Sequence, residues 1–121
     1  MEKPKEKNEK NFLDIIPRKN EKIRWRKEDK DGKTEVTLEI DNVGIINKIA
    51  QKLLKKPKVN YIHLDEMGSF IWQYIDSKKT VYEIAEYVSE HFKEKANPLY
   101  ERLIKYLKIL ESYGFINLKE E

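Results

Sequence analysis

The chain of 121 residues contains no cysteine, which excludes disulfide bonds and thiolate metal ligands. It has no apolar run near the roughly 18 residues that a membrane-spanning helix needs. The first ten residues are hydrophilic where a secretory signal would be apolar. With only four glycines, it also lacks a glycine-rich phosphate loop. We therefore expect a cytoplasmic protein that spans no membrane.

The chain also has little excess of either charge. Its 25 Lys and Arg residues against 22 Asp and Glu residues leave a formal net charge of +3, which is too little to indicate nucleic acid without a basic cluster. The two histidines, His63 and His91, have no cysteine, serine motif or ligand spacing around them. We expect a protein that is not an enzyme, with no catalytic residue, no metal and no cofactor.

Three amphipathic helical patterns fill the second half of the chain, between residues 65 and 113. Asp65 is suited to cap the first helix, because its carboxylate can accept from the free N–H groups of the first turn. Thr80 and Glu83 have the spacing of a capping box and predict the start of the second helix. These local signals predict a helical bundle joined by short turns.

The third helix is predicted to begin with Asn97 as its cap and Pro98 at its first position, and to end at Gly114 in a left-handed conformation. Its apolar arc covers roughly 220°, whereas packing against one core needs little more than about 100°. Two interpretations stay open. Either an N-terminal sheet covers the second surface, or part of the arc lines a groove for a partner peptide.

A β-hairpin is predicted in the first half, with its turn at Asp31-Gly32. The register set by this turn places apolar residues opposite each other on one face and opposite charges on the other. The predicted pairs are Trp25 with Leu38, Ile23 with Ile40, and Arg24 with Glu39.

The remaining segments are less regular. Residues 1–11 alternate Lys with Glu and predict a disordered tail, and residues 12–16 form an apolar plug that fits either an edge strand or a core loop. A helix is expected at about residues 44–56, where the lysines suit a solvated face better than a phosphate or membrane contact. Residues 59–64 predict a third strand, and residues 115–118 a short final one.

Three short helices beside a hairpin also describe a winged helix that reads DNA. We keep a DNA-binding transcriptional regulator as the alternative function, although a phosphate-binding helix should carry charge of mainly one sign. The exposed face of the third helix instead mixes basic and acidic residues: Arg102, Lys105 and Lys108 with Glu101 and Glu111.

Several short motifs together resemble the family of coenzyme PQQ synthesis protein D (PqqD). They are Leu64-Asp65-Glu66-Met67-Gly68, Ile71-Trp72, Asp76, the run Thr80-Val81-Tyr82-Glu83-Ile84-Ala85, and Tyr113-Gly114-Phe115. The resemblance covers about residues 18 to 116. Three positions depart from the family pattern, with Asp65 in place of Asn, Gly68 in place of Ala, and Ser77 in place of the turn Gly.

The resemblance implies an α+β, winged helix-turn-helix-like fold in a single domain at residues 12–118. A small antiparallel sheet of about three strands would pack on a three-helix bundle, with the helix at about 44–56 inserted between strands two and three. It also implies a function: a non-catalytic recognition element that holds the leader of a ribosomally made precursor peptide. Such elements present the leader to a radical SAM or other peptide-modifying enzyme. Whether this chain acts in PQQ synthesis or in another pathway stays open.

In such domains the leader adds as a strand to the third strand of the sheet and lies against the last helix. We expect Tyr61, Ile62, Tyr100, Ile104 and Leu107 to form the floor and wall of the groove, and Lys105 and Lys108 to meet acidic groups of the peptide. The full predicted site is Val59, Asn60, Tyr61, Ile62, His63, Tyr100, Ile104, Leu107, Lys105 and Lys108. Two points stay open: whether residues 12–16 occupy this edge, and whether the chain forms a homodimer through its hairpin.

Overall fold

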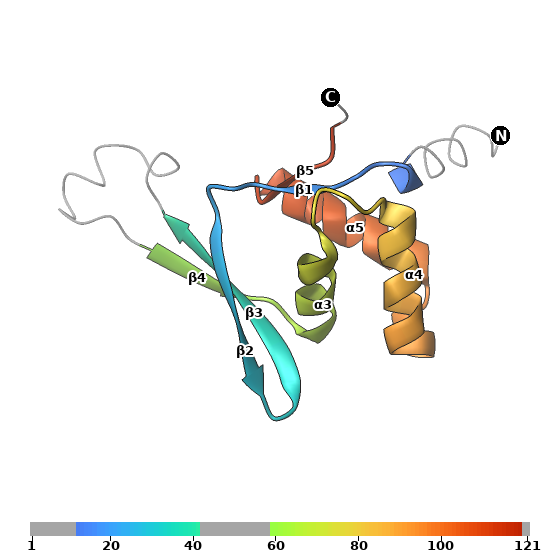
Figure 1. Cartoon of the computed structure of the whole chain (residues 1–121), viewed down its shortest axis with the longest axis horizontal. Coiled ribbons are helices and arrows are strands. Elements are labelled where there is room, and N and C mark those ends of the chain that lie inside the picture. The colour runs from blue at the N-terminus through green and yellow to red at the C-terminus, as the bar shows by residue number, and fades with distance from the viewer. Residues whose placement is uncertain (1–11, 42–58, 120–121) are drawn as a thin grey trace. The chain divides into compact units, whose positions relative to one another are not determined.

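The structure, a computed structural model, describes residues 12–41 and 59–119 (Figure 1). The predicted disordered tail at 1–11 and the predicted inserted helix at 44–56 lie outside the described residues. The elements, labelled as in Figure 1, are β1 (Arg18–Lys19), β2 (Arg24–Lys30), β3 (Lys33–Asp41), β4 (Val59–His63), α3 (Glu66–Tyr74), α4 (Val81–Phe92), the 3-10 helix η1 (Lys93–Ala96), α5 (Leu99–Ser112) and β5 (Ile116–Asn117).

The chain forms two compact units. One consists of residues 21–69 and contains the β2–β3–β4 sheet, and the other consists of residues 1–20 and 70–121 and contains α4, α5 and the β1–β5 pair. The boundary between the units falls inside α3. An α+β structure with a small antiparallel sheet and three helices is thus confirmed.

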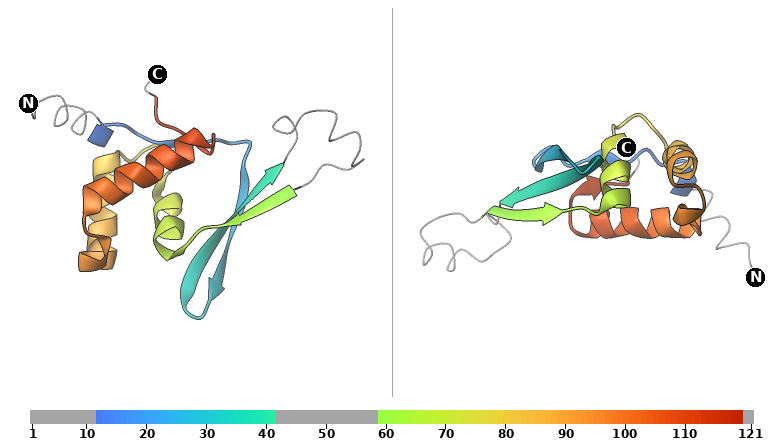
Figure 2. Two further views of the ribbon diagram at one scale, coloured as in Figure 1. Left: turned by 180° about the vertical axis from the view of Figure 1, so that it is seen from behind. Right: turned by 90° about the horizontal axis from the view of Figure 1, so that it is seen from below.

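The sheet of residues 21–69 is antiparallel, in the order β2–β3–β4 (Figure 2). Asp31 and Gly32 form its two-residue turn and have φ values of 52° and 78°, the positive values that a type I′ turn requires. The predicted pairs Trp25–Leu38 and Arg24–Glu39 are confirmed. Ile23 lies just before β2, so the predicted pairing of Ile23 with Ile40 lies outside the observed ladder.

The two faces of this sheet differ in chemistry. Side chains alternate along a strand, so Val36, Leu38 and Ile40 of β3 share one face and are all buried. The opposite face carries charged residues from β2 and β3, together with Thr37, which is also buried. We call these the apolar face and the polar face.

The first turn of α3 closes the end of the sheet where β4 stops. The Asp65 carboxylate accepts from the backbone N–H of Gly68 at 2.7 Å, so the predicted cap is confirmed. The Ser69 hydroxyl accepts from the backbone N–H of Val36 at 2.8 Å and donates to the carbonyl of Leu64 at 3.1 Å. Ser69 therefore bridges a backbone N–H of β3 and the backbone carbonyl of the residue that follows β4.

In the helical unit, local capping starts α4 and ends α5. Thr80 and Glu83 form the predicted capping box, each side chain bonded to the backbone N–H of the other. Gly114 has a φ of 81°, and the N–H of Phe115 donates to the carbonyl of Leu110 at 2.9 Å, which completes the left-handed helix end predicted here.

The predicted start of the third helix was wrong by one residue. Helix α5 begins at Leu99 with Pro98 as its N-cap, and no side chain caps it. Asn97 instead ends η1, with its backbone N–H donating to the carbonyl of Glu94 at 3.1 Å. The backbone N–H of Asn97 therefore belongs to the end of η1. The helical periodicity of the sequence did not reveal this 3-10 turn.

Residues 12–20 run as a strap across the helical unit. The Ile15 carbonyl accepts from the N–H of Val81, the first residue of α4, at 2.8 Å. At its other end, β1 pairs with β5, and Asn20 donates to the carbonyls of Gly114 and Phe115. Residues 12–16 are therefore not an edge strand, and β5 confirms the predicted short final strand.

Candidate functional site

Strand β4 lies at an edge of the three-stranded sheet (Figure 1). The N–H of Leu64 donates to the carbonyl of Val36 at 2.9 Å. This hydrogen bond determines which backbone groups of β4 point toward β3. In an antiparallel ladder the orientation alternates with each residue. The N–H and C=O groups of Leu64 and Ile62 therefore point toward β3, and those of Tyr61 and His63 point toward the outer edge.

The opposite edge, β2, is different. Every residue of β2 except Trp25 is charged, and all seven are exposed. Charged side chains along an edge strand disfavour the addition of another strand. Strand β4 carries no Lys, Arg, Asp or Glu, so this sheet has one edge protected by charge and one edge without that protection.

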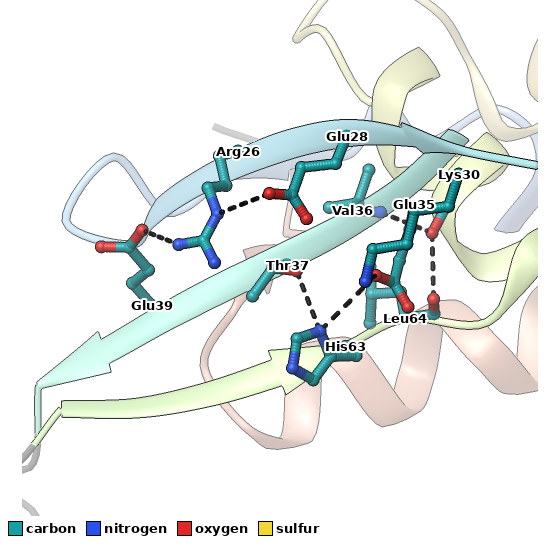
Figure 3. A network of polar contacts seen from close by, with 10 residues as sticks. Arg26, Glu28, Lys30, Glu35, Val36, Thr37, Glu39, His63 and Leu64 are labelled. Carbon is teal, nitrogen blue, oxygen red and sulfur yellow. Dashed lines mark hydrogen bonds and ion pairs between the residues drawn. The ribbon is translucent and has the colours of Figure 1, made fainter. Parts of the chain in front are cut away.

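The polar face of the sheet holds a network of paired charges (Figure 3). Arg26 Nη1 lies 2.8 Å from Glu39 Oε2, and Arg24 Nε lies 3.4 Å from Glu39 Oε1. Lys30 Nζ lies 3.2 Å from Glu35 Oε1. These pairs join β2 to β3 on a solvent-exposed surface, where each contributes at most about 1 kcal/mol.

Two side chains of β4 extend this network toward the free edge. Thr37 Oγ1 lies 3.0 Å from His63 Nδ1, and Glu35 Oε1 lies 3.8 Å from the same nitrogen (Figure 3). The Arg26 guanidinium lies over the Tyr61 ring, 5.7 Å from its centroid. Contacts from β2 and β3 thus orient both Tyr61 and His63.

The β4 residues predicted to bind a peptide are together on this edge, but not on one face. Tyr61 is 55% exposed and Ile62 36%, and Asn60 and His63 are also exposed. Tyr61 pairs with Glu39 and Ile62 with Leu38, so their side chains lie on the polar and the apolar face respectively. Tyr61 and Ile62 lie on opposite faces because neighbouring residues of a strand point in opposite directions, and their predicted place in the floor and wall of a peptide groove stays a prediction. Val59 pairs with Asp41 at the start of β4.

The predicted residues of α5 belong to the helical unit. Tyr100 is 40% exposed and Lys105 is exposed, whereas Ile104 is half-buried. Leu107 is fully buried, so its side chain is part of the packed interior in this structure. Lys108 Nζ lies 5.5 Å from the centroid of the Phe12 ring in the strap.

Sequence reasoning missed the residues that support the site. Arg26, Thr37 and Glu35 were not identified as neighbours of Tyr61 and His63, although the hairpin register already placed Arg26 and Thr37 on one face. A further hydrogen bond that was missed lies within α4. Tyr82 donates to the Glu86 carboxylate, and this hydrogen bond raises the pKa of Tyr82, with Tyr100 adding to the effect.

Within residues 12–41 and 59–119, no three histidine or acidic side chains are grouped so that they could hold a metal ion. In the same residues, none of the helices has the length and apolar character needed to cross a bilayer.

The comparisons with known proteins point to one family. Residues 36–116 match the family model described as coenzyme PQQ synthesis protein D (PqqD). Neither a curated protein nor a solved structure matched the chain. The matched residues include all the motifs that carried the resemblance in the sequence, from Leu64 to Phe115. The family match covers more than half of the chain, and the chain therefore belongs to the coenzyme PQQ synthesis protein D family.

Proposed function

We propose that this chain is a non-catalytic peptide adaptor. It binds the leader of a ribosomally made precursor peptide by strand addition to β4, and it presents the peptide to a modifying enzyme such as a radical SAM enzyme. Family membership makes the chain a PQQ-biosynthesis-like accessory protein, and the peptide and enzyme are the partners that this role requires. The observation that supports strand addition is the outer edge of β4, which presents backbone groups without protecting charges.

Strand addition fits the chemistry of this edge. Backbone N–H and C=O groups that point outward are bound to water in the free protein and must be paired when they are covered. An extended peptide pairs them with its own backbone, which gives affinity with little demand on sequence. Side chains on the two faces of β4 then supply selectivity.

The DNA-binding alternative is not favoured by the sheet. In a winged helix the hairpin would contact phosphates with basic side chains, but Arg24, Arg26 and Lys30 of this hairpin are paired with acidic residues. The winged-helix relationship and the contacts of Tyr100, Ile104, Lys105 and Lys108 with a peptide stay predictions.

A proline scan of the two edges tests the proposal. In Tyr61→Pro, the lost N–H points outward, so the β3–β4 ladder stays intact while strand addition loses a donor. The control is Lys27→Pro, because the backbone N–H of Lys27, which pairs with Val36, also points away from β3, at the opposite edge of the sheet. The peptides are candidate leaders encoded near this gene, and binding is followed by amide chemical shifts and amide exchange.

We expect a leader to slow amide exchange at Tyr61 and His63 and to shift the amide signals of β4. Tyr61→Pro should abolish this response, while Lys27→Pro should retain it. A leader that binds Tyr61→Pro as tightly as the unaltered chain would refute strand addition at β4. A response confined to β2 would refute it as well.

A further inference from the structure

The strand pairings align side chains in rows across the sheet. On the apolar face, Trp25, Leu38 and Ile62 form one row. On the polar face, the neighbouring row consists of Arg24, Glu39 and Tyr61. Each row ends at β4, so a strand added there would place one side chain at the end of each row.

The row on the apolar face ends in Ile62. Leu38 at its centre is fully buried, while Ile62 at the open end is 36% exposed. Since the backbone groups of Ile62 point toward β3, its neighbour on an added strand would sit in a non-hydrogen-bonded pair, the type in which side chains approach most closely. An apolar side chain at this place would cover the exposed part of Ile62.

The row on the polar face ends in Tyr61, which is 55% exposed. One side of its ring lies under the Arg26 guanidinium, which is itself held by Glu39 at 2.8 Å. Arg26 of β2 therefore contacts the Tyr61 ring from one side. Because Tyr61 is in the edge strand β4, a strand added to that edge would lie directly beside the ring. Aromatic and β-branched residues make the most favourable cross-strand pairs with such a ring.

The ion pairs on the polar face favour an uncharged peptide side chain beside Tyr61. Glu39 is paired with both Arg24 and Arg26, and Glu35 is paired with Lys30. A charged side chain of the bound peptide beside Tyr61 would thus compete with these ion pairs, whereas an aromatic or β-branched side chain would only add contact area.

We propose that the bound peptide is recognised on both faces of the sheet. An aromatic or β-branched residue of the peptide pairs with Tyr61, and the next residue of the peptide is apolar and pairs with Ile62. This inference rests on the proposed function and names the class of peptide that the edge selects. Tyr61 and Ile62 are then the two specificity-determining residues of β4.

The probe is a phage-displayed library of random peptides selected on the full chain. Selection is repeated on Tyr61→Thr and Ile62→Thr, in which threonine keeps a residue that favours strands, and on the control Lys27→Thr at the opposite edge. Calorimetry then compares the affinity of one selected peptide for the four proteins, and amide exchange locates where that peptide binds.

We expect enriched peptides to share an adjacent pair of an aromatic or β-branched residue and an apolar residue. Tyr61→Thr should remove the first preference and Ile62→Thr the second, each with a loss of affinity of up to about fivefold. Lys27→Thr should retain both preferences.

Two different results would separate this inference from the proposed function. If selected peptides slow exchange at Tyr61 and His63 but both preferences survive the threonine substitutions, the inference is overturned and strand addition stands. If selected peptides leave exchange in β4 unchanged, or no peptide is enriched, strand addition and the inference both fail.

Discussion

Ser77 has a φ of 65°, a left-handed conformation that glycine adopts more easily than any other residue. The PqqD-like pattern places a glycine at this turn, so Ser77 occupies the family's glycine position with an unfavourable backbone. The turn is held instead by Asp76, whose Oδ1 accepts from the backbone N–H groups of Lys78 and Lys79. A side-chain contact thus compensates locally for a residue that does not favour the turn.

Ser77→Gly should raise the free energy of unfolding by about 0.5–1 kcal/mol, because the relief of left-handed strain exceeds the added flexibility of the unfolded chain. The matched control is Ser89→Gly in the right-handed helix α4, which should lower it by about 0.5 kcal/mol. Urea denaturation measures both. A destabilised Ser77→Gly would contradict the assigned backbone strain.

Asp76 also gives stability a dependence on pH. Its hydrogen bond to Lys79 Nζ at 2.6 Å lowers the pKa of Asp76 to about 2, from 3.8. Because the pKa is lower in the folded state, this carboxylate stabilises the fold above about pH 4, and the contribution is lost as the pH falls toward 2. Asp76 is largely exposed to solvent, so the effect is modest.

Asp76→Asn should therefore unfold more easily than the unaltered chain at pH 7, by at most about 1 kcal/mol. The difference should shrink between about pH 4 and pH 2, where the native carboxylate becomes protonated. In a Lys79→Met background, Asp76→Asn should cost less. Denaturation curves across this pH range provide the measurement, and a gap that is as wide at pH 2 as at pH 7 would disprove the assignment.

At the scale of elements, the hydroxyl of Ser69 joins β3, the end of β4 and the first turn of α3. It is fully buried, and it satisfies the N–H of Val36 and the carbonyl of Leu64. Both of these groups would be left in the interior without their partner if the hydroxyl were removed. A buried donor or acceptor in this position costs the free energy of its lost hydration.

Ser69→Ala should lower the free energy of unfolding by about 1–3 kcal/mol. The control is Ser112→Ala, since the Ser112 hydroxyl is exposed and bonds to the Ile109 carbonyl within its own helix, and its loss should change stability by less than about 0.5 kcal/mol. Thermal denaturation of the three proteins compares them. Equal effects of the two substitutions would show that the Ser69 bridge does not support the sheet.

At the scale of the whole molecule, each unit contains one tryptophan. Trp25 lies in the sheet unit and is 37% exposed, and Trp72 lies in the helical unit and is fully buried. Helix α3 runs through the boundary between the units without a break, so unfolding one unit would also disrupt the helix of the other. We therefore expect one cooperative transition, as in most single domains of this size.

Two variants test this expectation. Trp25→Phe leaves Trp72 as the reporter of the helical unit, and Trp72→Phe leaves Trp25 as the reporter of the sheet unit. In each variant, tryptophan fluorescence and far-ultraviolet circular dichroism should give the same urea midpoint. A fluorescence midpoint that differs from the circular dichroism midpoint in either variant would show that the units unfold separately.

The sequence alone predicted the features that depend on neighbouring residues. The Asp31-Gly32 turn, the Asp65 cap, the Thr80–Glu83 capping box and the end of α5 at Gly114 each depend on residues a few positions apart. The hairpin register followed as well, because alternating side chains and a two-residue turn allow one pairing. The family could also be recognised from the order of these local signals.

Only the tertiary structure decided what depends on residues far apart in the chain. The Ser69 bridge joins positions separated by 33 residues, the strap places Phe12 beside Lys108, and Leu107 is withdrawn into the interior. Periodicity shows that a helix has a wide apolar arc, but it does not show which part of the arc other residues cover. The physical reason is that burial and long-range hydrogen bonds are set by the packing of whole elements, whereas caps and turns are set by the backbone of a few adjacent residues.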